Sequence, residues 1–190
     1  MCDNLAYAEE SWDELIDGKI VLMSPRPATD HIRTAGNIYH ILRSYLRGKR
    51  CKVFPDGMDL YLTDTDRFIP DVMVVCDHSK IKNDGIHGAP DLVVEVLSPS
   101  SIKRDRIYKK SIYEKCGVRE YWIVNPMDKS IDVYCLKDGV YQLTDICSLP
   151  PDFWLKKLEE KEKAEIKMEI TPSVFSGLTI ALADIFEDVT

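Results

Sequence analysis

The sequence lacks the patterns that mark several common classes of protein. Its six cysteines are scattered and include no CxxC pair, so neither a disulfide framework nor a zinc site is indicated. Its four histidines form no HxxxH or HExxH pattern, which argues against a histidine-rich metal site. We therefore expect reduced cysteines with mostly structural roles.

Membrane and export signals are also missing from the sequence. No apolar stretch approaches the ~18–20 residues that span a bilayer. The first residues, MCDNLAYAEESWDELIDG, are acidic and lack the basic start and apolar run of a signal peptide. These absences predict a cytoplasmic protein without a membrane segment.

What is present suits an ordinary globular protein. The chain has 190 residues, of which 45% are hydrophobic and 30% charged, and we expect residues 1–190 to form a single domain. The net charge of −7 argues against nonspecific coating of nucleic acid. Two basic stretches, 31–52 and 103–119, could nevertheless face a phosphate backbone, or could simply be solvated helix faces.

Hydrophobic periodicity predicts an α/β protein with a mixed sheet. Helices are expected over 31–47, capped by Asp30, and from the SPSS segment to about Cys116. Strands or strand pairs are expected over 16–25, 51–63, 68–76, 91–97, 119–126 and 131–143, the last with a turn at Asp138-Gly139. The order of these elements is typical of a layered α/β fold.

The C-terminal region is harder to interpret. Residues 154–170 look helical by composition. Residues 170–186 contain a proline, a glycine and alternating apolar residues, and are expected to form either a helix followed by a strand or a mostly extended segment.

One residue in the strand DLVVEVL calls for a chemical explanation. Glu95 lies in a strand that is apolar on both faces, where a carboxylate must be paired, hydrogen-bonded, protonated or bound to a metal. Asp71 opens the preceding strand, so the two acids converge if the strands are neighbours. Paired carboxylates suit Mg²⁺, or Mn²⁺, which prefers oxygen ligands. The alternative is a structural ion pair between Glu95 and a basic residue of a packing helix.

A basic residue follows in the next helix. Asp105 and Lys109 are four residues apart, and Lys109 could hold the attacking water or a phosphate. The alternative is a surface ion pair of little energetic weight.

Three segments carry a resemblance to a known family. IPDVMVV, GAPDLVVEVLSPSS and RDRIYKKSIYEKCGVREYWIVNP resemble the Uma-two family of restriction-endonuclease-like proteins, in the PD-(D/E)XK nuclease superfamily. The likeness extends to ELIDGKIVLMSP, to His31 and to FSGLTIALADIF. It implies a restriction-endonuclease-like core, a mixed β-sheet flanked by helices, with metal-dependent hydrolysis of phosphodiester bonds in DNA.

The resemblance also implies site residues. Asp71 matches the superfamily's first aspartate and Glu95 its second acid. The usual lysine lies two positions after that acid, where this chain has Leu97, and the family's D-x-x-x-K pattern instead matches Asp105 and Lys109. The predicted catalytic residues are thus Asp71, Glu95 and Lys109, and the predicted metal ligands are Asp71, Glu95 and the Val96 carbonyl. We expect Glu95→Ala and Lys109→Ala to abolish cleavage without unfolding the protein.

Weaker candidates and alternatives stay open. Asp91 shares the face of Glu95 but is more simply a partner of neighbouring backbone, and His31 either approaches the site or makes a local hydrogen bond at the helix start, the simpler interpretation. Tyr113 is expected in the core. The fold could also serve as a binding or assembly module without catalysis. By analogy with restriction enzymes, cleavage of both strands would suit a homodimer.

Overall fold

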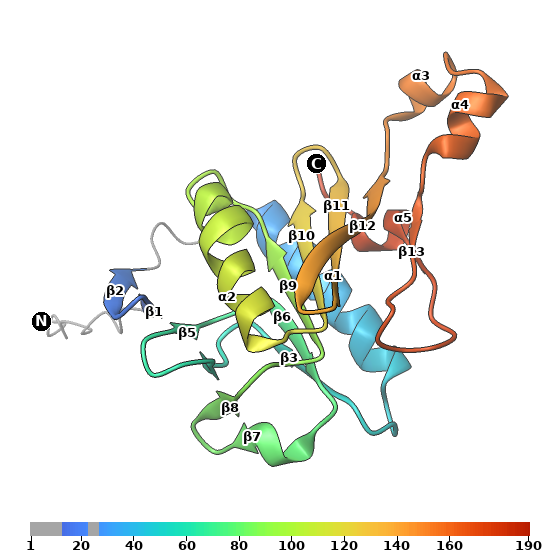
Figure 1. The fold of residues 1–190 in the computed structure, drawn as a ribbon. Coiled ribbons are helices and arrows are strands. Elements are labelled where there is room, and N and C mark those ends of the chain that lie inside the picture. The colour runs from blue at the N-terminus through green and yellow to red at the C-terminus, as the bar shows by residue number, and fades with distance from the viewer. Residues whose placement is uncertain (1–12, 23–26) are drawn as a thin grey trace, which may run out of the picture.

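The computed structural model describes residues 13–22 and 27–190, and a six-stranded mixed sheet forms its centre (Figure 1). The strand order is β12-β11-β10-β9-β6-β3, and only β9 and β10 are parallel. The strands are β3 (Lys52–Pro55), β6 (Val72–Val75), β9 (Leu92–Val96), β10 (Glu120–Asn125), β11 (Ser130–Lys137) and β12 (Val140–Ser148). The predicted mixed sheet is confirmed.

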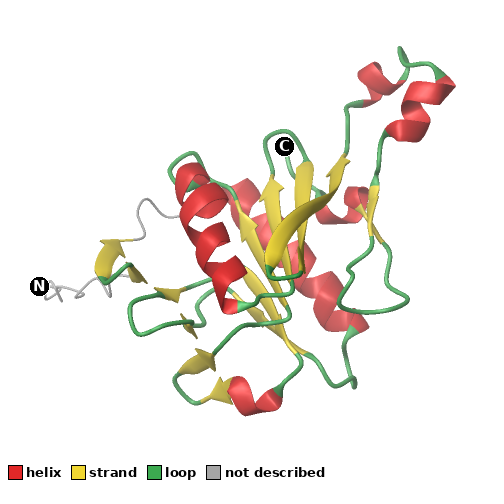
Figure 2. Cartoon of the chain, viewed as in Figure 1, coloured by secondary structure: helices red, strands yellow, loops and turns green. Residues whose placement is uncertain are grey.

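Helices cover the two faces of this sheet (Figure 2). On one face, α1 (Thr29–Tyr45) buries Ile38 and Leu42 in a core that includes the even-numbered valines of β9. On the other face, a π-helical segment, η2 (Arg104–Lys109), leads into α2 (Lys110–Cys116) and buries Tyr113 beside Val93. Because alternate side chains of β9 enter different cores, its sequence is apolar throughout.

A second sheet of short strands lies beside the first. Its order is β2-β1-β5-β4-β8-β7. The strands are β1 (Asp13–Ile16), β2 (Lys19–Leu22), β4 (Leu60–Tyr61), β5 (Arg67–Phe68), β7 (Ile81–Lys82) and β8 (Gly85–His87), with a 3-10 turn, η1 (His78–Lys80), before β7. The sequence predicts only part of this sheet, because strands of two to four residues show too little periodicity.

The first hairpin forms where the turn signal lies. Asp17 and Gly18 connect β1 to β2 with φ angles of 51° and 71°, the left-handed conformation that a tight hairpin turn requires. The expected end of this segment at Pro25 falls outside the described residues.

The helix boundaries differ from the prediction in two respects. Ala28, not Asp30, precedes the first turn of α1, and the Asp30 carboxylate accepts a hydrogen bond from Thr190 Oγ1 at 2.9 Å. The carboxylate is therefore used to dock the C-terminal end of the chain. The π-helical turn at the start of the second helix was not predicted. It depends on tertiary contacts that bury Asp105 and Lys109, and the local sequence does not reveal them.

The C-terminal region corrects the expected long helix. In place of one helix over 154–170 there are two short ones, α3 (Asp152–Leu155) and α4 (Glu160–Glu165), and neither has a buried residue. A helix without a packing surface has little to stabilise it beyond its first turns. Residues 149–168, hereafter the arm, project from the body (Figure 1).

The chain after the arm is mostly extended, as one of the two alternatives predicted. It forms β13 (Glu169–Ile170), β14 (Ile180–Ala181) and a helical turn, α5 (Leu182–Ile185), which contacts α1. The helical turn therefore follows the two strands, whereas the other predicted alternative placed a helix before a strand. Across residues 13–22 and 27–190, no helix combines the length and apolar character that crossing a membrane requires.

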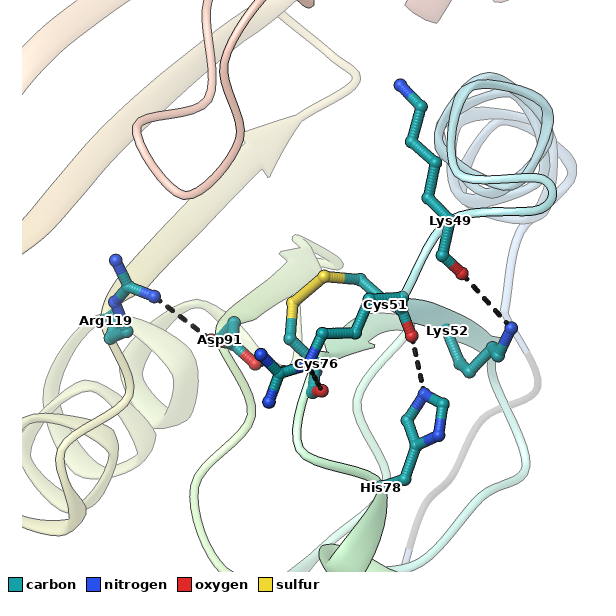
Figure 3. The surroundings of a disulfide bond; sticks show 8 residues. Lys49, Cys51, Lys52, Cys76, His78, Asp91 and Arg119 are labelled. Atoms are coloured by element: carbon teal, nitrogen blue, oxygen red, sulfur yellow. Dashed lines mark hydrogen bonds and ion pairs between the residues drawn. A yellow bond between two sulfur atoms is a disulfide. The ribbon is translucent and has the colours of Figure 1, made fainter.

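The expectation that all cysteines are reduced is wrong for one pair. Cys51 and Cys76 form a disulfide beside Asp91 and His78 (Figure 3). The pairing of Lys52 with Val75 continues by one residue to the two cysteines, so the β3–β6 register brings them together. Their separation of 25 residues carries no such information. Cys116, Cys135 and Cys147 are free, and Cys2 falls outside the described residues.

A buried glutamate fastens the C-terminal segment to the sheet. Glu120, fully buried at the start of β10, accepts a hydrogen bond from Trp122 Nε1 at 2.6 Å through Oε1. Its Oε2 accepts hydrogen bonds from Ser173 N at 2.7 Å, Ser173 Oγ at 2.6 Å and Val174 N at 3.2 Å. These four hydrogen bonds offset the cost of removing the carboxylate from water.

We expect Glu120→Ala to lower the free energy of unfolding by about 3 kcal/mol, because the buried Trp122 N–H loses its acceptor and the segment at Ser173 and Val174 loses its attachment to the sheet. Urea denaturation measures the change. Glu187→Ala, at an exposed glutamate, is the matched control and should change stability by no more than about 0.5 kcal/mol. Equal effects of the two substitutions would contradict the anchoring role of Glu120.

Candidate active site

A buried lysine stands at the centre of the candidate site. Lys109 is 1% exposed, and its Nζ lies 2.7 Å from Glu14 Oε1 and 2.9 Å from Glu95 Oε1. Asp105, 2% exposed, is also near, with Oδ1 at 3.8 Å from the same nitrogen. The π-helical turn directs both Asp105 and Lys109 inward, so the surface ion pair considered as an alternative is excluded.

Asp71 and Glu95 meet across neighbouring strands, as the sequence predicted if β6 and β9 were adjacent. The antiparallel register pairs Val72 with Val94, and one further step places Asp71 opposite Glu95. Asp71 Oδ2 accepts a hydrogen bond from Val96 N at 2.7 Å. Val96 thus contacts the aspartate through its N–H, and the ligand role of its carbonyl stays a prediction.

Leu97 occupies the position where the superfamily usually has its lysine. It is 6% exposed and packs in the apolar cluster with Val93 and Tyr113. Lys109 reaches Glu95 from the helix instead. The Lys109 ammonium therefore contacts Glu95, and its role as the relocated lysine stays a prediction.

Glu14 is a member of the cluster that the sequence analysis missed. It is fully buried on β1, and its Oε1 also accepts a hydrogen bond from Ile69 N at 3.1 Å. The small sheet carries it there, because β1 pairs with β5, which directly precedes the Asp71 segment. Asp56, in the turn after β3, also interacts electrostatically with Lys109 and Glu14. The sequence held one indication of Glu14, an acid next to the apolar residues of the segment ELIDG.

His31 approaches the site, contrary to the simpler interpretation of a local hydrogen bond. Its Nε2 lies 2.9 Å from Asp71 Oδ1, and its Nδ1 is buried without a partner among the described residues. Burial lowers the pKa of His31, although the charge of Asp105 raises it in part. A neutral imidazole that donates from Nε2 would hold Asp71 in place.

Tyr113 belongs to the core, as expected, but it also contacts the site. Its hydroxyl donates a hydrogen bond of 2.6 Å to Glu95 Oε1, the oxygen that faces Lys109. The hydrogen bonds to Glu95 within the described residues all reach Oε1, so Oε2 is left to take another ligand.

Burial and crowding govern the charges of this cluster. Burial alone would lower the pKa of Lys109, but the carboxylates of Glu95, Glu14 and Asp105 outweigh it and raise that pKa, so the lysine is charged. Burial raises the pKa of Glu95 well above its ordinary range and that of Asp71 to about 7, while Lys109 opposes both shifts. The acidic side chains around Lys109 therefore outnumber its single ammonium.

The remaining candidates have structural partners. Asp91 accepts a hydrogen bond from Cys76 N at 2.8 Å through Oδ2 and pairs with Arg119 at 3.2 Å through Oδ1, so it neighbours the disulfide (Figure 3). In the basic stretch 103–119, Lys109 and Arg104 face the carboxylate cluster and Arg106 pairs with Asp132 at 2.6 Å. This stretch is therefore not a uniformly solvated face.

The described residues offer few free side-chain ligands to a divalent cation. They contain no group of three or more His, Cys, Asp or Glu side chains arranged to hold a metal ion. Mg²⁺, however, is often held by only one or two carboxylates together with waters and substrate phosphates. Glu95 Oε2 is available for this, and Glu14 Oε2 and Asp105 Oδ1 are buried without hydrogen-bond partners among the described residues.

The fold of this chain has a counterpart among solved structures. The fold is a mixed sheet flanked by helices, with an aspartate and a glutamate on adjacent strands. The crystal structure of "a putative nuclease belonging to DUF820" from Anabaena variabilis has the same fold, with a TM-score of 0.69 and 22% identity. The alignment covers 93% of this chain and 90% of that chain.

The chain belongs to the Uma2 family, described as "Putative restriction endonuclease", whose model matches residues 5–166. A curated relative, "Uncharacterized protein slr1290" of Synechocystis sp., is 29% identical over 127 residues. That match covers 66% of this chain and 66% of the relative, just under two thirds of its length.

The sequence analysis expects Lys109→Ala to leave the fold intact, whereas the buried contacts predict a loss of stability, because removing this ammonium leaves several buried carboxylates without their cation. We expect Lys109→Met to lower the free energy of unfolding by about 3–5 kcal/mol. The matched control is Lys103→Met, at an exposed lysine six residues earlier, with a change within about 0.5 kcal/mol. Chemical denaturation measures the free energy of unfolding of both variants. Similar small losses of stability in the two would contradict the central role of Lys109.

The raised pKa of Asp71 predicts a pH-dependent stability effect. Its pKa is about 7 in the folded protein and 3.8 ordinarily, so the folded state retains a proton that the unfolded state releases, and stability falls as pH rises between about 4 and 7. Asp71→Asn removes this loss. Relative to the wild type, the variant should gain up to a few kcal/mol over that interval, since one pKa unit corresponds to about 1.4 kcal/mol.

Urea denaturation with a metal chelator at several pH values measures this gain. Asp91→Asn is the control at the other end of the strand pair. A stability difference between Asp71→Asn and the wild type that stays constant with pH would contradict the raised pKa.

Proposed function

We propose that the protein is a divalent-metal-dependent nuclease that hydrolyses phosphodiester bonds in DNA, with Mg²⁺ or Mn²⁺ as cofactor. The observation that carries the proposal is the contact of 2.9 Å between the buried Lys109 ammonium and Glu95, on the strand beside Asp71. Membership of the Uma2 family supports the activity in outline. The choice of metal, the role of each residue and DNA as the substrate are part of the proposal.

The metal would be held by Asp71 and Glu95. A bound divalent cation would polarise a phosphate and lower the pKa of water. Within the chain, Val96 N and His31 fix the two oxygens of Asp71, and Tyr113 together with Lys109 fixes one oxygen of Glu95. Both acids are thereby oriented before any ligand binds, which is the condition for effective electrostatic catalysis.

Lys109 would act on the substrate phosphate or on the attacking water. Its three donors can serve Glu14, Glu95 and one further oxygen, since an ammonium is a point charge without a fixed fork geometry. Glu14 would keep the ammonium charged and in place. We therefore assign Glu14 as a positioning residue for Lys109.

A second function, a nuclease fold that binds or assembles without cleaving, is favoured by two observations. Both oxygens of Asp71 already have partners, and the described residues contain no group of three metal-ligating side chains. In this alternative Lys109 would neutralise the carboxylates permanently.

The two functions differ in metal binding and cleavage. We expect wild-type protein to nick supercoiled plasmid DNA with Mg²⁺ or Mn²⁺ and to lose this activity in chelator. Glu95→Gln should reduce the rate at least about a hundredfold, because it removes a charged ligand. Asp91→Asn should retain nearly full activity, as it changes an acid on the same strand face outside the cluster.

Titration calorimetry with Mg²⁺ or Mn²⁺, with and without duplex DNA, completes the comparison. Metal binding that is lost in Glu95→Gln supports the nuclease. No metal binding together with no cleavage favours the module, and cleavage that persists in purified Glu95→Gln overturns the assignment of Glu95.

A further inference from the structure

The tip of the arm carries exposed aromatic side chains. Phe153 and Trp154 of α3 are 58% and 55% exposed, and their ring centroids lie 6.3 Å apart. The arm stands away from the main sheet on the side opposite the β1–β2 hairpin (Figure 1). Large apolar groups held in solvent on a projecting element are typical of an interaction surface.

A shallow groove lies at the base of the same arm. It has a volume of about 310 Å³ and is lined by Leu143, Thr144, Asp145 and Ile146 of β12 and by Glu165 and Lys167 of the arm. Its apolar walls, Leu143 and Ile146, are 47% and 59% exposed. β12 is an edge strand whose one partner in the described sheet is β11, apart from an isolated bridge between Cys147 and Lys167. Such an edge is open to another chain.

Tip and groove are complementary in charge as well as in polarity. Lys156 and Lys157 follow the aromatic pair after Leu155, and Lys157 Nζ lies 5.9 Å from the centre of the Phe153 ring. The groove presents the carboxylates of Asp145 and Glu165. Asp145 is partly neutralised by Lys167, whereas Glu165 is exposed.

The positions of tip and groove define the geometry of association. They lie at opposite ends of one arm, so two arms placed antiparallel about a two-fold axis bring each tip to the base of the other. The same contact then occurs twice, as an isologous interface requires.

We propose that two copies of this chain associate through their arms, with Phe153 and Trp154 of each copy seated in the β12 groove of the other. Lys157 of one copy then lies against Glu165 of its partner. A nucleic acid is a poor occupant of this surface, because the arm carries five acidic residues against five lysines and so has no net positive charge to offer a phosphate backbone. The proposal stands independently of the proposed nuclease activity.

The first test is the mass of the protein in solution. Sedimentation velocity over a range of concentrations should show a dimer for the wild type. Trp154→Glu should raise the dimer Kd at least about 30-fold, the effect expected of a central tryptophan. Ile20→Glu, at a side chain 70% exposed on β2, is the matched control and should leave the Kd unchanged.

Circular dichroism shows whether each variant is folded. A wild type that is monomeric at the highest soluble concentration overturns the proposal. So does a dimer whose Kd is the same for the folded Trp154→Glu variant.

The second test is a charge exchange that distinguishes this contact from any other dimer. Lys157→Glu and Glu165→Lys should each raise the Kd, about tenfold for a contact excluded from water. The double variant restores opposite charges across the two-fold axis and should recover an affinity close to that of the wild type. Single variants with unchanged affinity, or a double variant as weak as the singles, would overturn the pairing of tip with groove.

Discussion

The site depends on one interaction, the burial of the Lys109 ammonium between Glu14 and Glu95. A lysine with 1% exposure is tolerated only because carboxylates surround it, and those carboxylates are tolerated only because the lysine is charged. This mutual dependence links three separate elements: β1 of the small sheet, β9 of the large sheet and the π-helical turn. The contact thus joins three parts of the fold at one buried charge.

The same interaction explains the architecture around it. The small sheet has short strands, yet it delivers Glu14 and leads the chain into Asp71. The π-helical turn is an irregular element, yet it directs Asp105 and Lys109 inward together. The short strands and the π-helical turn thus lie where charged side chains contact one another. The regular strands of the large sheet support them.

Much of this could be predicted from local pattern. The run DLVVEVL indicated a strand covered on both faces, and an acid in such a strand indicated a partner, which the structure supplies in Lys109 and Tyr113. Predictions failed where the structure depends on contacts between segments that are distant in the sequence. Cys51 and Cys76 meet only through the β3–β6 register, and the helix expected over 154–170 is divided because no core lies beneath it.

The sequence by itself determined the mixed α/β class and the two-sided burial of β9, because side-chain periodicity is a local property. An acid in an apolar run singled out Glu95, whereas Asp71 and Lys109 became candidates beside it through the family resemblance. The tertiary structure alone decided that Glu14 and His31 join them, that Asp91 does not, and that Lys109 is as much a structural ion as a candidate catalyst. Those outcomes rest on strand order and burial, which arise from contacts between segments far apart in the chain.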